Sequence, residues 1–341
     1  MSHCVILREG RCGRLILDRP AALHALDLSL VTALAGGLQT HLHDPLVDHI
    51  LMTSSGGKAF CAGGDVRAVA LLGKQDPAAA AEFFRAEYRL NFAIATAEKP
   101  VVALVDGLSL GGGMGLSVHA RHCLVTTRAL MAMPEMAIGL FPDVGAGEFL
   151  NRLSPAVGKW LALTGARLGP GDCIAARLAS GFLPEGAQAS FLARLEAGPL
   201  DEALALCQPR SAETLDQLRP VIEKTFASDN LAEIQAALRA EATPWAEAQL
   251  QALAAGAPTS QLITLEHLRQ SRGQGLAAVL QRDFRLASQC LGQADFYEGV
   301  RAQLIDKDRN PHWQPAAAAA VSKFFLPPEW PDLSLDVCAG R

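Results

Sequence analysis

Two acidic residues, Glu135 and Asp143, stand eight positions apart in MAMPEMAIGLFPDVGAGEFL (131–150), a segment that is otherwise almost entirely apolar, glycine or proline. Acidic side chains are mostly exposed or cap helices. The ordinary interpretation is therefore that Glu135 points into solvent and that Asp143 caps the helix suggested by VGAGEFLNRL. The alternative is chemical, because a positioned carboxylate can move a proton or attack a carbonyl carbon. Other segments of the chain are needed to choose between the solvated or capping interpretation and the chemical one.

Two glycine-rich turns offer a second kind of chemical group, the backbone N–H. SSGGKAFCAGGDVRAV (54–69) is a strand end that opens into a turn before a helix, and GGGMG (111–115) follows a strand in the same way. Successive N–H groups in such turns can bind an anion or an oxyanion without a charged side chain. GGGMG lacks the G-x-G-x-x-G spacing, and SGGKAF lacks the Ser or Thr that follows Gly-Lys in a P-loop. The alternative is two structural turns without a ligand.

A further glycine motif, GLSLG (107–111), matches G-x-S-x-G between a strand and a helix. This is the context of the nucleophile elbow of α/β-hydrolases, with Ser109 as the nucleophile. The pentapeptide is short, and no later Asp and His stand in persuasive surroundings. A serine esterase that uses Ser109 is therefore kept as an alternative function.

Strands and helices alternate in the half of the chain that carries these groups. Strand-like segments such as KPVVALVDG run into glycine turns and then into helical patterns through about Leu183, which predicts an α/β domain with largely parallel strands. From about Pro184 the chain is rich in Ala, Leu, Glu, Gln and Arg, which predicts helices. We expect an α/β core over 1–184 and a mainly helical region over 185–341.

Composition limits the class of protein and its partners. The chain has 341 residues, of which 50% are hydrophobic and 19% charged, as in a globular enzyme. A net charge of −5 and the absence of a Lys or Arg block argue against nucleic acid as a partner. The N-terminus is charged where a signal peptide needs its apolar core, and the most apolar stretch contains Asp106 and many glycines. We expect a cytoplasmic protein that does not span a membrane.

Metal and disulfide chemistry are not indicated. The eight cysteines include no C-x-x-C pair. The cluster HLHDPLVDH (41–49) lies where a helix should end and a strand begin, so a solvated connection is favoured over a metal site. Neither a metal nor a separate cofactor is expected.

Three segments in order, AFCAGGD, KPVVALVDGLSLGGGMGLSVHA and MPEMAIGLFPDVGAG, resemble the enoyl-CoA hydratase/isomerase (crotonase) superfamily. In the second half, APTSQLIT, DFRLASQCL and DFYEGVRAQLIDKDRNPHW resemble its 3-hydroxyisobutyryl-CoA hydrolase branch. The resemblance implies a crotonase-like spiral of ββα turns followed by helices that cover the site. It also implies an acyl-CoA substrate, of which coenzyme A is a part, and allows a homo-oligomer.

The same resemblance assigns roles to residues. The backbone N–H groups of Ala62 and Gly112 would bind the thioester carbonyl oxygen as it becomes negative. Glu135 and Asp143 would be catalytic, with Asp143 holding a 3-hydroxyl group or shuttling a proton. The further substrate-binding residues would be Gly63, Gly64, Asp65, Glu87 and Gly111, although the sequence around Glu87 on its own favours a solvated helix residue. His24 stands where the family usually has Asn near the coenzyme A contact.

One missing residue selects among the reactions of the superfamily. Its hydratases use two glutamates, and the position of the first is Gly115 in this chain. Hydration needs one group to deprotonate water and another to complete the proton transfer, so simple hydratase activity is disfavoured. What remains is Glu135 with Asp143, the pair that the 3-hydroxyisobutyryl-CoA hydrolase branch has at the matching positions. The resemblance therefore implies hydrolysis of 3-hydroxyisobutyryl-CoA, a thioester of valine catabolism, and of related substrates such as 3-hydroxypropionyl-CoA. Glu135 would attack directly to give a mixed anhydride or would activate a water.

Two alternatives stay open within this fold. An enoyl-CoA isomerase needs only one carboxylate to move a proton between carbons, so Gly115 does not exclude it. A non-catalytic member would bind coenzyme A or serve as an assembly subunit; loss of Glu135 would favour that interpretation, but Glu135 is present.

Overall fold

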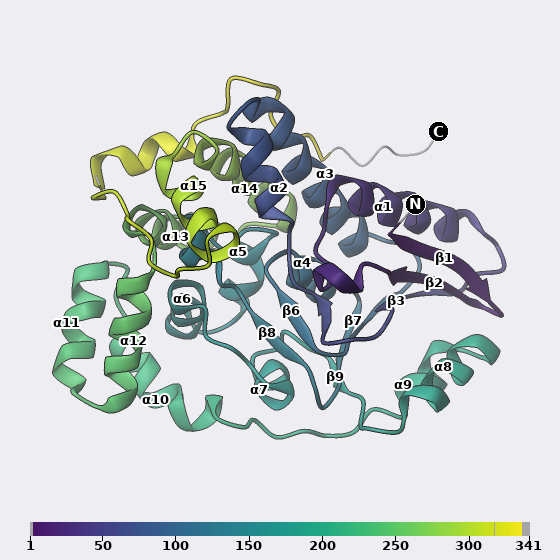
Figure 1. Cartoon of the computed structure of the whole chain (residues 1–341). Coiled ribbons are helices and arrows are strands. Elements are labelled where there is room, and N and C mark those ends of the chain that lie inside the picture. Colours follow the sequence, from purple (N-terminus) through teal and green to yellow (C-terminus); the bar gives the residue numbers. More distant parts are fainter. Residues whose placement is uncertain (1–2, 317, 336–341) are drawn as a thin grey trace. The chain divides into compact units, whose positions relative to one another are not determined.

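The structure is a computed structural model that describes residues 3–316 and 318–335 (Figure 1). The contacts between residues divide the chain into two compact units, each assembled from three segments. Unit 1 takes the described residues of Met1–Asp65, Ala93–Met133 and Ala166–Val221. Unit 2 takes those of Val66–Phe92, Pro134–Gly165 and Ile222–Arg341.

Every strand found in the described residues belongs to unit 1. The strands are β1 (Cys4–Glu9), β2 (Cys12–Leu17), β3 (His49–Ser54), β4 (Ala59–Cys61), β5 (Val101–Val105), β6 (Leu108–Leu110), β7 (His122–Val125), β8 (Leu130–Ala132) and β9 (Gly181–Phe182). They form a six-stranded sheet in the order β1-β2-β3-β5-β7-β9 and a three-stranded sheet in the order β4-β6-β8. Only the β1–β2 pair is antiparallel, as expected for two strands joined by a turn of two residues.

Three strand pairs give unit 1 its spiral. β3, β5 and β7 are parallel neighbours in the large sheet, and the strand that follows each of them, β4, β6 or β8, belongs to the small sheet. The chain therefore visits the two sheets alternately, and each visit to the small sheet is followed by a helix or turn that returns it. This is the spiral of ββα turns that the sequence predicts.

The helices of unit 1 lie between and after these strands. They are the 3₁₀ helix η1 (Pro20–Ala22), α1 (Leu28–His43), α4 (Gly112–Val118), α7 (Pro170–Ala175), α8 (Gln188–Ala197), α9 (Leu200–Leu204) and the larger part of α10 (Leu215–Thr225). Asp27 caps α1, because its carboxylate accepts a hydrogen bond from Leu30 N–H at 2.8 Å. Buried side chains of the large sheet, including Leu51 and Val102, pack with Phe191 and Leu195 of α8 in one apolar cluster.

Unit 2 is built from helices. Its α-helices are α2 (Val66–Gly73), α5 (Ala146–Phe149), α6 (Pro155–Thr164), α11 (Leu231–Glu241), α12 (Pro244–Ala255), α13 (Pro258–Ser271), α14 (Leu276–Cys290) and α15 (Ala294–Val300). To these it adds most of α3 (Pro77–Ala95), the end of α10 (Leu215–Thr225), the 3₁₀ helices η2 (Glu135–Ile138), η3 (Leu150–Arg152) and η5 (Ala318–Phe325), and the π-helix η4 (Arg301–Ile305).

The predicted fold class is confirmed. The last strand, β9, ends at Phe182, and the described residues beyond it contain helices without further strands. The two units interleave along the chain, whereas the sequence suggests one boundary near residue 184; that boundary stays a prediction. No helix among the described residues is long and apolar enough to cross a membrane.

Candidate active site

In unit 1 the two glycine turns lie beside each other because the strands that lead into them are paired. β4 and β6 run parallel, with Cys61 opposite Ser109. A methyl group on Gly63, where φ is +97°, would lie 2.9 Å from Leu110 O and 3.6 Å from Gly112 N. The two backbones therefore approach too closely at Gly63 for a larger residue, and the positive φ there also favours glycine.

Not every N–H of these turns is available to a substrate. Ala62 N–H donates to Leu23 O at 3.0 Å, Asp65 N–H donates to Leu26 O at 2.7 Å, and Gly111 N–H donates to Ala132 O at 3.1 Å. Among the residues that the structure describes, we find no acceptor for the N–H groups of Gly64 and Gly112. The role of Ala62 as a donor stays a prediction, and the geometry offers Gly64 as the alternative, because its N–H need not leave another partner.

The two candidate donors can be separated by changing the backbone alone. Glycolic acid in place of Gly64 turns the N–H into an ester oxygen, and we expect turnover to fall about 10²–10³-fold, the usual cost of removing one oxyanion donor. Lactic acid in place of Ala62 is the matched control and should cost less than about tenfold. The reverse pattern would assign the role to Ala62. Both esters are checked by initial rates of CoA release.

Other predicted residues of unit 1 have structural partners. The carboxylate of Asp65 lies 3.0 Å from the guanidinium of Arg19. His24, with φ at +57°, accepts from Arg19 N–H through Nδ1 at 3.1 Å, and its Nε2 lies 3.1 Å from Gly56 O. Both ring nitrogens of His24 are therefore used to hold the backbone of unit 1.

The surroundings of Ser109 do not resemble a nucleophile elbow. Ser109 is fully buried within β6, whereas the nucleophile of an elbow stands exposed on the turn between strand and helix. Its Oγ lies 3.4 Å from Ser117 Oγ, and Ser117 Oγ in turn donates to Gly113 O at 3.0 Å. Within the described ranges, no imidazole or carboxylate is bonded to Ser109.

We therefore expect Ser109→Ala to keep CoA release within about threefold of the parent rate, since it removes one buried hydroxyl with a weak contact. Initial rates and inhibition by a serine-directed phosphonate are the measurements. Loss of activity in the variant, together with phosphonate inhibition of the parent, would instead support the alternative function, a serine esterase that uses Ser109.

In unit 2 the three acidic residues that the sequence analysis assigns to the site are all buried. Glu135 begins η2, Asp143 lies in the loop before α5, and Glu87 is on α3. Their exposed fractions are 6%, 6% and 2%. The N-cap of α5 is Gly145, without a side-chain capping bond. The interpretation of Glu135 as solvated and of Asp143 as a helix cap is therefore wrong.

These residues form an acid cluster (Glu87, Glu135 and Asp143) in which each charge opposes the others. Burial, and then the charge of Asp143, raises the pKa of Glu135 and that of Glu87 well above the ordinary range. Burial raises the pKa of Asp143 to about 7, although a hydrogen bond from Tyr88 acts to lower it. Near neutral pH the cluster therefore retains protons, and it can offer both a carboxylate and a carboxylic acid.

Polar atoms in and beside the cluster have no protein partner. Glu135 Oε2, Glu87 Oε1 and both polar atoms of the Asn91 carboxamide are buried without a hydrogen bond among the described residues. Asn91 is four positions after Glu87, on the same face of α3. Buried polar groups are usually bonded, so these atoms are candidates for contacts with a substrate or water.

Sequence reasoning missed several neighbours of the acid cluster. Tyr88 donates a hydrogen bond to Asp143, Asp283 accepts one from Gly145 in the same loop, and His267 lies next to Asp283. Asp283 belongs to the segment DFRLASQCL noted above, and Tyr88 follows Glu87 directly, but neither position carries a recognisable motif of its own.

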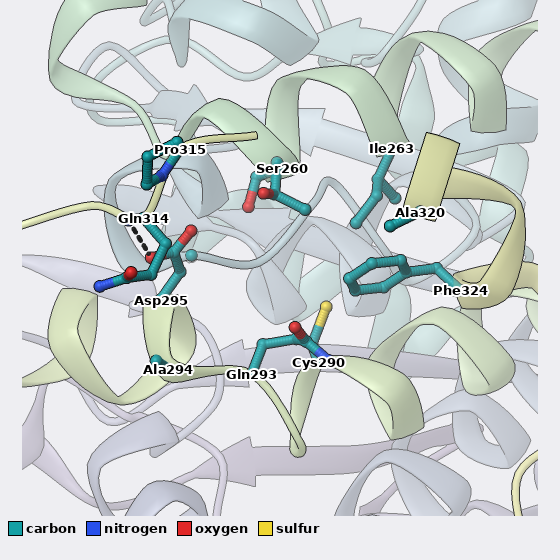
Figure 2. A pocket seen from close by; sticks show the side chains of 12 residues that line it. Ser260, Ile263, Cys290, Gln293, Ala294, Asp295, Gln314, Pro315, Ala320 and Phe324 are labelled. Carbon is teal, nitrogen blue, oxygen red and sulfur yellow. Dashed lines mark hydrogen bonds between the residues drawn. The ribbon is translucent and has the colours of Figure 1, made fainter. Parts of the chain in front are cut away.

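A separate small cavity of about 190 Å³ lies among helices of unit 2 (Figure 2). Ser260 and Ile263 of α13, Cys290 of α14 and Asp295 of α15 line it, and Asp295 Oδ1 accepts from Gln314 N–H at 2.8 Å. No member of the acid cluster lines this cavity. Two lining residues connect it to the cluster: Gly139 N–H donates to Glu135 O, and burial and the charge of Asp143 both raise the pKa of the Cys290 thiol.

The histidines of segment 41–49 do not gather around a common point. His41 Nε2 lies 3.2 Å from Arg14 O, His43 Nδ1 lies 2.7 Å from Gln39 O, and His49 Nε2 lies 2.8 Å from Leu195 O. Each ring therefore has its own backbone partner. Among the residues placed by the structure, no group of three or more His, Cys, Asp or Glu could hold a metal ion.

The spiral of unit 1, its paired glycine turns and the buried acids define an acyl-CoA enzyme of the crotonase type. A family model described as enoyl-CoA hydratase/isomerase matches residues 12–326, and the chain belongs to this family. Among curated relatives, 3-hydroxyisobutyryl-CoA hydrolase, mitochondrial, of Gallus gallus is 40% identical over 334 residues, which cover 94% of this chain and 87% of the relative. The Homo sapiens protein of the same name is 38% identical over 93% of this chain and 85% of its own length.

Solved structures agree on the fold but carry other names. A carnitinyl-CoA dehydratase from Mycobacterium thermoresistibile is 35% identical, with a TM-score of 0.94, and the match covers 99% of this chain and 100% of that one. An enoyl-CoA hydratase from Rhodobacter sphaeroides is 40% identical, with a TM-score of 0.90, over 98% and 100% of the two chains. The names of the relatives thus include both thioester hydrolysis and hydration chemistry.

Proposed function

We propose that this protein hydrolyses 3-hydroxyisobutyryl-CoA, and related 3-hydroxyacyl-CoA thioesters such as 3-hydroxypropionyl-CoA, to the free acid and coenzyme A, as a step of valine degradation. The buried acid cluster is the observation that carries the proposal, because it keeps carboxyl groups in both protonation states near neutral pH. Identity of about 40% to hydrolases over most of both chains supports the choice of substrate.

In the proposed reaction Glu135, as a carboxylate, attacks the thioester carbonyl carbon. The carbonyl oxygen becomes negative and is held by Gly112 N–H and a second donor of the glycine turns. Collapse of this intermediate breaks the C–S bond, releases the coenzyme A thiolate, which takes up a proton, and leaves a mixed anhydride on Glu135. Water then cleaves the anhydride, giving the hydroxy acid and restoring Glu135. In the alternative route Glu135 deprotonates the attacking water, and no anhydride forms.

Asp143 has a different task in this proposal. It accepts a hydrogen bond from the 3-hydroxyl group of the substrate or passes a proton to the leaving thiolate. Glu87 and Asn91 supply further polar contacts, in keeping with their buried, unpartnered atoms. Because Glu135 has a raised pKa, attack requires the acid cluster to lose a proton first, so turnover should rise with pH on the acidic side.

Hydration is disfavoured for this chain despite the names of the solved relatives. Gly115, which lies buried in α4, occupies the position of the first glutamate of the hydratases. A residue without a side chain cannot hold or deprotonate a water. Hydrolysis is therefore more consistent with Gly115 and Glu135 at these two positions than hydration is.

A panel of thioesters tests the reaction and the substrate together. Purified protein is incubated with 3-hydroxyisobutyryl-CoA, 3-hydroxypropionyl-CoA, isobutyryl-CoA and crotonyl-CoA, and free thiol and loss of the crotonyl double bond are followed separately. We expect thiol release, fastest with the 3-hydroxylated substrates, and no hydration. Double-bond chemistry without thiol release would overturn the hydrolase in favour of a hydratase or isomerase.

Chelators should leave this activity unchanged, because backbone N–H groups can supply the electrophilic assistance that a metal ion would otherwise give. Turnover is measured after prolonged EDTA dialysis and again after addition of Zn²⁺ or Mg²⁺. Activity that disappears with EDTA and returns with a metal would contradict the proposed mechanism.

The acyl-CoA substrate is the one partner that the proposal requires, and a homo-oligomer remains a prediction to be checked by light scattering. The cytoplasmic location expected from the sequence also stays a prediction. The curated relatives carry the word mitochondrial in their names.

A further inference from the structure

Tyr88 holds the carboxylate of Asp143 from within α3. Its side chain is fully buried, and its O–H donates to Asp143 Oδ2 at 2.6 Å. The ring packs against that of Phe84 one turn earlier, with 6.0 Å between the ring centroids. A buried ring on a helix has few alternative positions, so the hydroxyl fixes one oxygen of Asp143.

Asp283 of α14 forms a hydrogen bond with the loop that carries Asp143. It is fully buried, and its Oδ2 accepts from Gly145 N–H at 2.7 Å. Its Oδ1 lies 2.8 Å from Nε2 of His267 on α13, although the pair is not aligned as a hydrogen bond. The ring of His267 packs edge-on against the ring of Phe141, with 5.5 Å between the ring centroids. The loop is therefore held two residues before Asp143 and two residues after it.

We propose that Tyr88, Asp283 and His267 are positioning residues of the reaction: Tyr88 holds the Asp143 carboxyl group directly, and Asp283 and His267 hold the loop that carries it. This inference rests on the proposed function for the role of Asp143, and it extends that function to three residues outside the acid cluster. Neither the names of the relatives nor a sequence motif assigns such a role to them.

The groups that face Asp143 come from several elements. They are Glu87 and Tyr88 of α3, Glu135 of η2, and Asp283 and Cys290 of α14, while His267 is placed here through its contact with Asp283. Beyond the effect of burial, the hydrogen bond from Tyr88 lowers the pKa of Asp143 and the charge of Asp283 raises it. Removing either neighbour should therefore move the titration of Asp143, and the two shifts should have opposite signs.

The first test is the pH profile of CoA release. The limb that belongs to Asp143 is identified as the one absent from the residual activity of Asp143→Asn. We expect Tyr88→Phe to move this limb to higher pH and Asp283→Asn to move it to lower pH, each by about one unit, as for the loss of one strong interaction. A purely structural role would lower activity without such opposite shifts.

Matched controls are available within unit 2. Tyr297 is the one other tyrosine of the chain, and its O–H donates to Leu291 O at 2.6 Å. Asp295 is a buried aspartate that accepts a backbone N–H. Tyr297→Phe and Asp295→Asn remove comparable groups outside the acid cluster and should leave the limb in place. Thermal unfolding shows whether each variant is folded.

A second measurement does not depend on turnover. Growth on 3-fluorotyrosine in the Tyr297→Phe background places the label at Tyr88 alone. We expect its ¹⁹F resonance to titrate with a midpoint near pH 7, the titration to disappear in Asp143→Asn, and the midpoint to fall in Asp283→Asn.

The two measurements separate the inference from the proposed function. If the labelled protein behaves as expected but releases no coenzyme A from any thioester, the contacts with Asp143 stand and the hydrolase fails. A resonance that does not titrate, or that titrates unchanged in Asp143→Asn, overturns the positioning role. So does a Tyr88→Phe enzyme whose pH limb is that of the parent.

Discussion

Glu135→Gln is expected to lower the rate of CoA release from 3-hydroxyisobutyryl-CoA by about 10²–10⁴-fold or more. Glutamine has nearly the same size and polarity, but it is neither a nucleophile nor a base, so both routes for thioester cleavage lose their central group. The loss should appear in kcat, because the substrate contacts made by other residues remain. Initial rates and the dissociation constant of a non-hydrolysable thioether analogue are the two measurements.

Glu148→Gln is the matched control for this variant. Glu148 lies thirteen residues further along in α5 and forms an ion pair with Arg152 at 2.6 Å. Surface pairs of this kind contribute little, so activity should stay near the parent value. A Glu135→Gln enzyme with more than about a tenth of the parent rate would remove Glu135 from the chemical step.

The route taken by Glu135 is open to a direct test. If an anhydride forms, a single turnover in H₂¹⁸O should place ¹⁸O on the Glu135 carboxyl group or on the product, according to which anhydride carbonyl the water attacks. If Glu135 only activates water, the isotope should appear in the product alone. Mass spectrometry of the peptide that contains Glu135, with Glu135→Gln as the blank, therefore identifies the anhydride route by ¹⁸O on Glu135, whereas ¹⁸O in the product alone is the result common to both routes.

The spiral of unit 1 is predictable because local patterns specify it. Valine-rich runs such as 101–105, glycine turns and helical periodicity each report on a few consecutive residues, and their alternation fixes the fold class. The burial of Glu135 and Asp143 is predictable only in part, because an apolar context favours it while the ordinary tendency of acids opposes it. It is the resemblance to the superfamily that favours burial of the two acids over exposure.

Local sequence patterns do not predict which residues hold the site in place. Tyr88 and Asp143 are 55 positions apart, and Gly145 and Asp283 are 138 apart. Nothing local to either partner signals that the two will meet. The same limit applies to the donors in the first glycine turn. Its glycines indicate that N–H groups will be exposed, but which of them remain available depends on Leu23 and Leu26, almost forty residues earlier.

Asp143→Asn is expected to damage the enzyme in a way that depends on the substrate. If Asp143 accepts the 3-hydroxyl hydrogen bond, the variant should lose about 10–100-fold more activity on 3-hydroxyisobutyryl-CoA than on isobutyryl-CoA, which lacks the hydroxyl. The two enzymes and two substrates form a double-mutant cycle that isolates this one contact. If Asp143 instead passes a proton to the leaving thiolate, both substrates should slow equally, by about 10²-fold or more.

Two features of the site make this variant informative. Asparagine keeps an oxygen that can accept the Tyr88 hydrogen bond, so the loop should stay in place, and thermal unfolding verifies that it does. Loss of the Asp143 charge also removes one cause of the raised pKa of Glu135, so Glu135 should ionise at lower pH in the variant. The residual activity should therefore have an acidic limb at lower pH than that of the parent enzyme. Asp143→Asn activity within about threefold of the parent on both substrates, with an unchanged pH profile, would show that Asp143 takes no part in the reaction.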